Sequence, residues 1–157
     1  MLRLSKKTDY ALLALQYLGS EAASGVASTR AIAERFDIPV ELLAKILQQL
    51  ARHGLVVAHK GVHGGYLLAR PAQDISVADV VHAIDGPITL TACSPRDERC
   101  GQFGSCTVRD PLWRAREQIL GVLQKLTVGD MDDRTNRATL LAVRTNRPDA
   151  AVQVQTR

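Results

Sequence analysis

Three cysteines, Cys93, Cys100 and Cys106, are the residues of this 157-residue chain whose type and spacing best suit chemistry. They follow the pattern Cys-x6-Cys-x5-Cys, and the chain has no other cysteine. Thiolates are soft ligands for iron–sulfur clusters and zinc, whereas a disulfide framework normally uses an even, dispersed set. The pattern also lacks the paired Cys-x2-Cys of structural zinc sites. The residues alone therefore indicate a soft-metal site or a thiol switch.

Three thiolates leave one coordination position for another ligand, which makes a cluster more labile than one held by four cysteines. Such lability suits a sensor. The sequence shows no Ser-His-Asp, Cys-His or paired-carboxylate arrangement, and no histidine follows His82. We therefore expect a metal or redox sensor and not an enzyme.

The charge of the chain is mildly positive and concentrated in its first half. The net charge is +4, and residues 1–70 carry nine Lys or Arg against five Asp or Glu. This balance is compatible with a polyanionic partner without requiring one. No apolar run approaches the roughly 18 residues of a membrane span, and the first residues lack the apolar stretch of a signal peptide. We therefore expect a cytoplasmic protein with no membrane partner.

Apolar side chains that recur every three or four residues predict five helices. These helices span residues 6–18, 30–36, 40–53, 76–84 and 111–126. Two short apolar runs, 55–58 and 66–69, predict a β-hairpin with a basic, glycine-rich tip. Ser28 and Ser76 are predicted helix caps, and Asp79 completes a capping box with Ser76. The expected fold is mostly α-helical with one small hairpin.

The order of helix, helix, short turn, helix and hairpin is that of a winged helix-turn-helix, which we assign to residues 1–87. Residues 88–131 are expected to form a cysteine loop and a long dimerisation helix. The apolar stripe of that helix is wide enough to face more than its own domain. Residues 132–157 lack periodicity and are expected to be a largely disordered tail.

This order predicts binding of double-stranded DNA, with the 40–53 helix in the major groove and the hairpin tip in a minor groove. The non-apolar face of the helix offers donors and acceptors to base edges, while cations elsewhere suit phosphates. The candidate residues are Val40, Glu41, Ala44, Lys45 and Gln48 on the helix, Lys60, His63, Gly64 and Gly65 on the hairpin, and Lys6, Tyr10, Thr29 and Arg30 for phosphates. The alternative is that these are ordinary solvated faces.

Six stretches between residues 4 and 88 also resemble one family, and the resemblance as a whole runs from about residue 1 to 131. They are Leu4-Ser5-Lys6 with Asp9-Tyr10-Ala11, Ile32-Ala33, Leu43 to Leu50, Gly54-Leu55-Val56, Lys60-Gly61 with Gly64-Gly65-Tyr66-Leu67-Leu68, and Ile84-Asp85-Gly86-Pro87-Ile88. Together they resemble the Rrf-type family of winged helix-turn-helix transcription regulators, which includes the iron–sulfur regulator IscR and the nitric-oxide sensor NsrR. The resemblance implies a homodimer on a palindromic operator, in which the long helix crosses its symmetry mate.

The resemblance further implies an iron–sulfur cluster, 2Fe–2S or 4Fe–4S, held by Cys93, Cys100 and Cys106. The chain departs from IscR at Arg109, where IscR has a histidine ligand, and at Ala44, where IscR has a base-discriminating glutamate. Some NsrR-like members use a carboxylate from the partner subunit, which makes Asp9 the candidate fourth ligand. Asp9 equally suits a plain role at its helix N-terminus, and Glu117, solvent or a small thiol are other possible ligands.

The resulting prediction is a transcription regulator, more specifically a repressor. An iron–sulfur cluster would control its operator binding in response to iron–sulfur status, oxidative stress or nitric oxide. The alternative is a winged-helix regulator with a structural zinc or a cysteine thiol switch.

Overall fold

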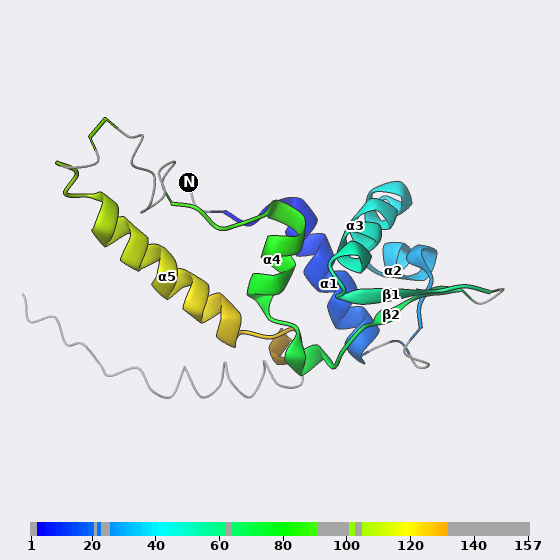
Figure 1. The fold of residues 1–157 in the computed structure, drawn as a ribbon. Helices are drawn as coiled ribbons and strands as arrows, with labels where there is room; N and C mark the ends of the chain where they lie inside the picture. The colour runs from blue at the N-terminus through cyan, green and yellow to red at the C-terminus, as the bar shows by residue number, and fades with distance from the viewer. Residues whose placement is uncertain are drawn as a thin grey trace, which may run out of the picture.

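The computed structural model describes residues 3–20, 22, 26–61, 64–90, 101–102 and 105–131. Cys93, Cys100, His63 and the predicted tail, 132–157, lie outside the described residues. The elements are α1 (Lys6–Ser20), α2 (Thr29–Phe36), α3 (Val40–Arg52), β1 (Val56–His59), β2 (Gly65–Leu68), η1 (Ala72–Asp74), α4 (Val77–Asp85), α5 (Arg109–Lys125) and η2 (Gly129–Met131), as Figure 1 shows. In the part described, no helix is long and apolar enough to span a membrane.

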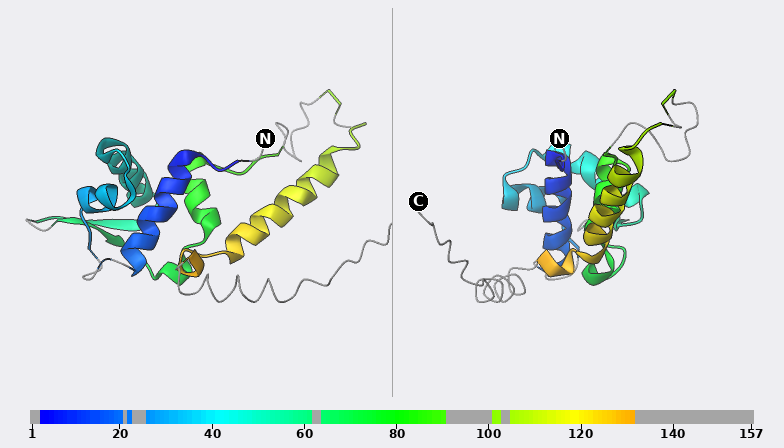
Figure 2. Two further views of the ribbon diagram at one scale, coloured as in Figure 1. Left: turned by 180° about the vertical axis from the view of Figure 1, so that it is seen from behind. Right: turned by 90° about the vertical axis from the view of Figure 1, so that its left-hand side faces the viewer.

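The predicted fold class is confirmed, because the helices are accompanied by one two-stranded antiparallel hairpin. Helices α1, α3 and α4 pack on one another, and α2 packs on α3. Figure 2 shows the hairpin at one end of the molecule and α5 at the other. The core is aliphatic, and its largest fully buried side chains include Leu15, Ile32, Leu43, Ile46, Leu47, Leu50, Ile75 and Val80.

Both predicted caps are present. The Ser28 side chain accepts a hydrogen bond from the Ala31 N–H, so α2 begins at Thr29. Ser76 and Asp79 form the full capping box at the start of α4, in which each side chain accepts from the other residue's N–H. These contacts satisfy N–H groups that the first helical turn leaves without partners.

The strands differ by one residue from the predicted runs, 55–58 and 66–69. Gly54 adopts a left-handed conformation with φ +69, and the Leu55 N–H donates to the Leu50 carbonyl. Leu55 therefore completes the end of α3, and pairing starts with Val56 opposite Leu68. The left-handed Gly54 and the hydrogen bond from Leu55 to Leu50 together form a common helix C-terminal motif, which favours glycine.

The chain after α5 returns to the core. Its backbone runs antiparallel to residues 75–77, with Val77 donating to the Leu126 carbonyl and Val128 donating to Ile75. Val128 is 1 % exposed, and Gln16 of α1 donates to the Met131 carbonyl. The end of α5 is therefore fixed against α1 and α4. Helix α5 starts at Arg109, two residues before the predicted start at residue 111, because the first turn of a helix tolerates a proline such as Pro111.

Candidate nucleic-acid interface and metal centre

Helix α3 has one buried apolar face and one exposed mixed face. Its buried residues are Leu43, Ile46, Leu47 and Leu50. Glu41, Lys45 and Gln48 are exposed, Val40 is 44 % exposed and Ala44 is half-buried. The 3.6-residue period places these five side chains away from the core. The face carries a cation, a carboxylate, an amide and two small apolar groups, which is a set able to read base edges.

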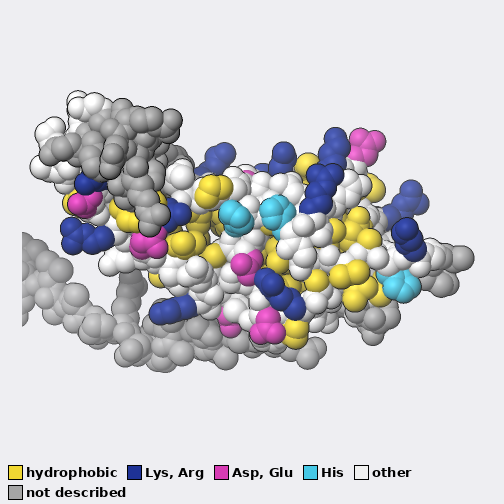
Figure 3. All heavy atoms as spheres, viewed as in Figure 1, with side chains coloured by type: hydrophobic (Ala, Val, Ile, Leu, Met, Phe, Trp, Pro, Cys, Tyr) yellow, Lys and Arg dark blue, Asp and Glu magenta, His cyan; other side chains and the backbone are white. Residues whose placement is uncertain are grey.

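The predicted phosphate-contact residues occupy the first turns of two helices. Arg30 is exposed at the start of α2, next to half-buried Thr29. Lys6 is exposed at the start of α1, and its ammonium lies 5.0 Å from the centre of the Tyr10 ring. Tyr10 itself is half-buried against the core. Figure 3 shows Lys and Arg side chains spaced along the upper edge of the molecule, from α1 past α3 toward the hairpin.

The hairpin projects beyond the helices and carries exposed Lys60. Two glycines predicted as DNA contacts, Gly64 and Gly65, also have a backbone role. The Gly64 N–H closes a turn onto the Gly61 carbonyl at 2.9 Å. Gly65 lies against Ala27, and Ala27 forms an isolated antiparallel β-bridge with Tyr66, the next residue of the hairpin. The hairpin is thereby joined to the chain that enters α2.

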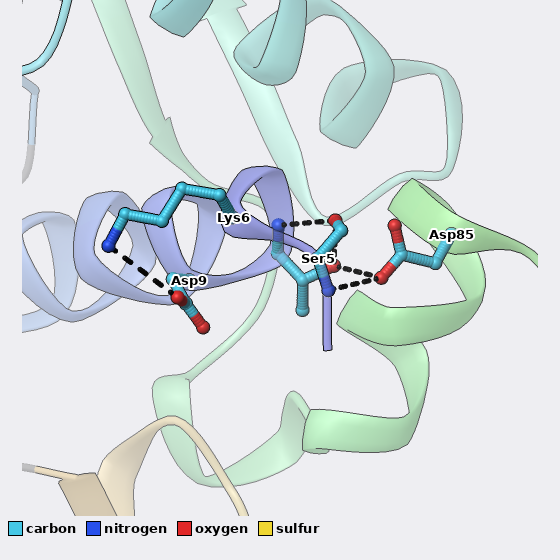
Figure 4. Close-up of polar contacts among 5 residues, drawn as sticks. Ser5, Lys6, Asp9 and Asp85 are labelled. Carbon is cyan, nitrogen blue, oxygen red and sulfur yellow. Dashed lines mark hydrogen bonds and ion pairs between the residues drawn. The ribbon is translucent and has the colours of Figure 1, made fainter. Parts of the chain in front are cut away.

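The start of α1 is held by a residue that the sequence analysis did not assign, Asp85 at the end of α4 (Figure 4). Its carboxylate accepts from the Ser5 N–H at 3.1 Å and from the Thr8 hydroxyl at 2.8 Å. Partial burial would raise the pKa of Asp85, but hydrogen bonds from Ser5 and Thr8 and the charge of Lys7 lower it below its ordinary value. The available sequence signal was an aspartate at a helix C-terminus, where a negative charge is unfavourable.

Asp9 lies in the first turn of α1 and pairs with Lys6 at 3.7 Å (Figure 4). Its side chain is 47 % exposed, so this ion pair is weak. Cys106 is a free, half-buried cysteine that precedes α5. Figure 1 shows the first turn of α5 well separated from the first turn of α1. The helix that carries Asp9 and the helix that follows Cys106 thus begin far apart within one protomer.

The residues that begin α5 are engaged in other contacts. The Arg109 guanidinium lies 2.8 Å from the Asp110 carboxylate. Its hydrogen bond and its charge lower the pKa of Asp110. A guanidinium has only donors, so Arg109 is not a metal ligand. Glu117 forms an ion pair with Arg116, whose Nε also donates to the Ile88 carbonyl at 2.7 Å.

The described residues contain no group of three or more His, Cys, Asp or Glu side chains able to hold a metal. Two of the three cysteines fall outside those residues, so the candidate cluster ligands remain a prediction.

Comparison with known proteins gives the family. The family model Rrf2, described as iron-dependent transcriptional regulator, matches residues 4–134. The chain belongs to the Rrf2 family. A Mycobacterium tuberculosis protein named as an HTH-type transcriptional regulator, Rv1287, is 38 % identical over 134 residues, which cover 83 % of this chain and 81 % of that protein.

Two solved structures resemble this Rrf2 chain over most of their length. CymR, the global cysteine regulator of B. subtilis, has a TM-score of 0.70 and 27 % identity, covering 86 % of this chain and 99 % of that one. IscR of T. potens has a TM-score of 0.66 and 28 % identity, covering 87 % and 90 %. The protein is therefore an Rrf2-family helix-turn-helix transcriptional regulator, a DNA-binding class and not an enzyme.

Proposed function

We propose that this Rrf2-family regulator represses transcription as a homodimer on a palindromic operator, and that an iron–sulfur cluster on Cys93, Cys100 and Cys106 controls its operator binding. The observation that carries the proposal is the three-cysteine segment of an iron-dependent family, located between α4 and α5. One end of this segment follows the DNA-reading helices, and the other leads into the helix proposed to join two subunits.

Helix α3 is the proposed reader of the major groove. Lys45 and Gln48 can donate to acceptors on base edges, and Glu41 can accept from cytosine. Val40 is the most exposed apolar residue of this face, and it suits contact with a thymine methyl group. Lys60 on the hairpin would lie in an adjacent minor groove, where negative potential attracts a cation.

Helix α5 supports the homodimer, because none of its residues is buried within the protomer. Val122 is 66 % exposed, and Leu112 and Leu126 are also exposed. A second copy that packs against this apolar stripe would remove it from water and gain the usual free energy of apolar burial. The resulting two-fold symmetry would place two copies of α3 about 34 Å apart, one turn of DNA.

The donor set fits an iron–sulfur cluster. Thiolates are the preferred cluster ligands, and Cys106 is free and partly accessible at the end of the segment. Asp9 of the partner subunit is the proposed fourth ligand, since its own ion pair with Lys6 is exposed and weak. A bound cluster supplies a redox- and nitric-oxide-sensitive centre, and its loss would release this link between subunits.

The alternative is a zinc site or thiol switch on the same cysteines. Arg109 favours this alternative over an IscR-type cluster with four protein ligands. Its guanidinium is paired with Asp110 and has no lone pair for a metal. The likeness to CymR, a cysteine regulator, supports it as well.

Anaerobic purification separates these functions. The proposal predicts a coloured protein with bound iron and sulfide, and a Cys106→Ser variant with less of both. Ser105→Ala, a change beside the donor set, should keep wild-type iron and sulfide. A colourless protein with stoichiometric zinc would establish the zinc alternative, and a metal-free protein with reversibly oxidised cysteines would establish the thiol switch.

A further inference from the structure

We infer that Asp85 is a positioning residue for DNA binding, because its carboxylate holds the first turn of α1 so that Lys6 and Lys7 reach DNA phosphates. This inference rests on the proposed DNA binding. It assigns a role to a residue of α4 that lies outside the helix-turn-helix and the hairpin.

The contact joins two distant parts of the chain. The Thr8 hydroxyl and the Asp85 carboxylate are 77 positions apart, and the Ser5 N–H is 80 positions from the same carboxylate. Thr8 is completely buried. Among the residues that the structure describes, Asp85 is the only one outside the segment 5–20 that hydrogen-bonds Ser5 or Thr8.

Helix electrostatics indicate which helix this carboxylate stabilises. Asp85 is the last residue of α4, where the partial negative charge of the helix end repels a carboxylate. The N-terminus of α1 carries partial positive charge and unpaired N–H groups, which favour one. Asp85 therefore stabilises the start of α1 at the expense of its own helix.

The first turn of α1 carries the cations that this contact would position. Ser5 caps the helix by accepting from the Thr8 N–H at 3.2 Å, and Lys6 and Lys7 come between these two residues. Both lysines are exposed. Fixing Ser5 and Thr8 from one side fixes the backbone from which both lysines extend, which lowers the entropy lost when they meet phosphates.

The test compares three variants on one 30-base-pair duplex of arbitrary sequence, because phosphate contacts are independent of sequence. Asp85→Ala removes the acceptor. Thr8→Val removes the main side-chain donor without changing charge or shape. Asp79→Ala is the matched control. It also removes a carboxylate of α4, but one that contacts Ser76 and Arg70 instead of α1.

In Asp85→Ala and Thr8→Val, the slope of log affinity against log salt should become shallower by about 1 to 2, because each phosphate contact contributes about 0.9. The Ser5, Thr8 and Asp9 amides should exchange hydrogen about fivefold faster, the factor for one lost hydrogen bond. Asp79→Ala should show neither change.

Wild-type slope and exchange in both variants would overturn the inference. A wild-type chain without affinity for duplex DNA would instead overturn the proposed function and, with it, the role of the two lysines. The exchange rates would still decide whether Asp85 holds α1.

Discussion

Gly65 lies so close to Ala27 that a Cβ atom on Gly65 would be 2.2 Å from the Ala27 carbonyl oxygen. Ala27 and Tyr66 exchange two backbone hydrogen bonds, of 3.0 and 2.9 Å. Because Ala27 precedes the Ser28 cap, this bridge fixes the start of α2 relative to the hairpin.

Gly65→Ala should therefore destabilise the protein by about 1–3 kcal/mol, the usual cost of overpacking, and should also weaken DNA binding. Urea unfolding measures the first effect. Gly121→Ala is the control, since a Cβ there meets no atom within 4 Å and alanine favours a helix. Equal stability of the two variants would contradict the proposed backbone role.

The homodimer depends on the apolar side chains exposed on α5. Val122→Glu should abolish the dimer in analytical ultracentrifugation while leaving the protomer folded, because Val122 is 66 % exposed and surface changes have small effects on stability. Gln124→Glu, at another exposed position of α5, adds the same charge and should remain dimeric. A dimeric Val122→Glu protein would place the subunit interface elsewhere.

The stability contribution of Asp85 should depend on pH in one direction. Its pKa is lowered in the folded protein because the bonds from Ser5 and Thr8 and the charge of Lys7 outweigh its partial burial. A group whose pKa is lowered by folding stabilises the folded protein. This stabilisation is complete above the ordinary pKa of 3.8 and is lost as pH falls through the folded-state pKa. Asp85→Asn should therefore have a lower free energy of unfolding in urea than the wild type. This difference should be constant near neutral pH and shrink in acid. A difference that grows in acid would mean that folding raises the pKa of Asp85 instead of lowering it.

Lys45 and Lys6 should differ in how they affect operator binding. Lys45→Ala removes a base contact and should cost about 1–3 kcal/mol while relaxing preference at one base pair. Lys6→Ala removes a phosphate contact and should weaken all sequences similarly, with a salt slope lower by about 1. Binding assays on a set of single-base operator variants distinguish the two patterns. If only Lys6→Ala lost preference at a base pair, Lys6 would be the base contact and the role assigned to Lys45 would be wrong.

Features that depend on residues three or four apart were predictable from sequence. The buried stripe of α3, the Ser28 cap and the Ser76–Asp79 capping box all follow from local spacing. The exposed positions of Glu41, Lys45 and Gln48 follow from the same period.

Long-range contacts were not predictable. Nothing local to Thr8 indicates Asp85, 77 positions later, and nothing local to Gly65 indicates Ala27. Val128 follows the predicted end of the last helix, yet it is buried because the backbone after α5 pairs beside Ile75. The family resemblance made Asp9 a candidate cluster ligand, and the structure adds that this carboxylate already has a weak partner in Lys6.

Operator affinity of anaerobic protein, measured with the cluster present and after its removal by a chelator, tests the proposed control most directly. The proposed mechanism predicts a difference of about 5- to 150-fold between the two forms, the usual range of coupling between sites. Cys106→Ser should give one affinity under both treatments. Equal wild-type affinities with and without bound iron and sulfide would contradict control of the operator by the cluster.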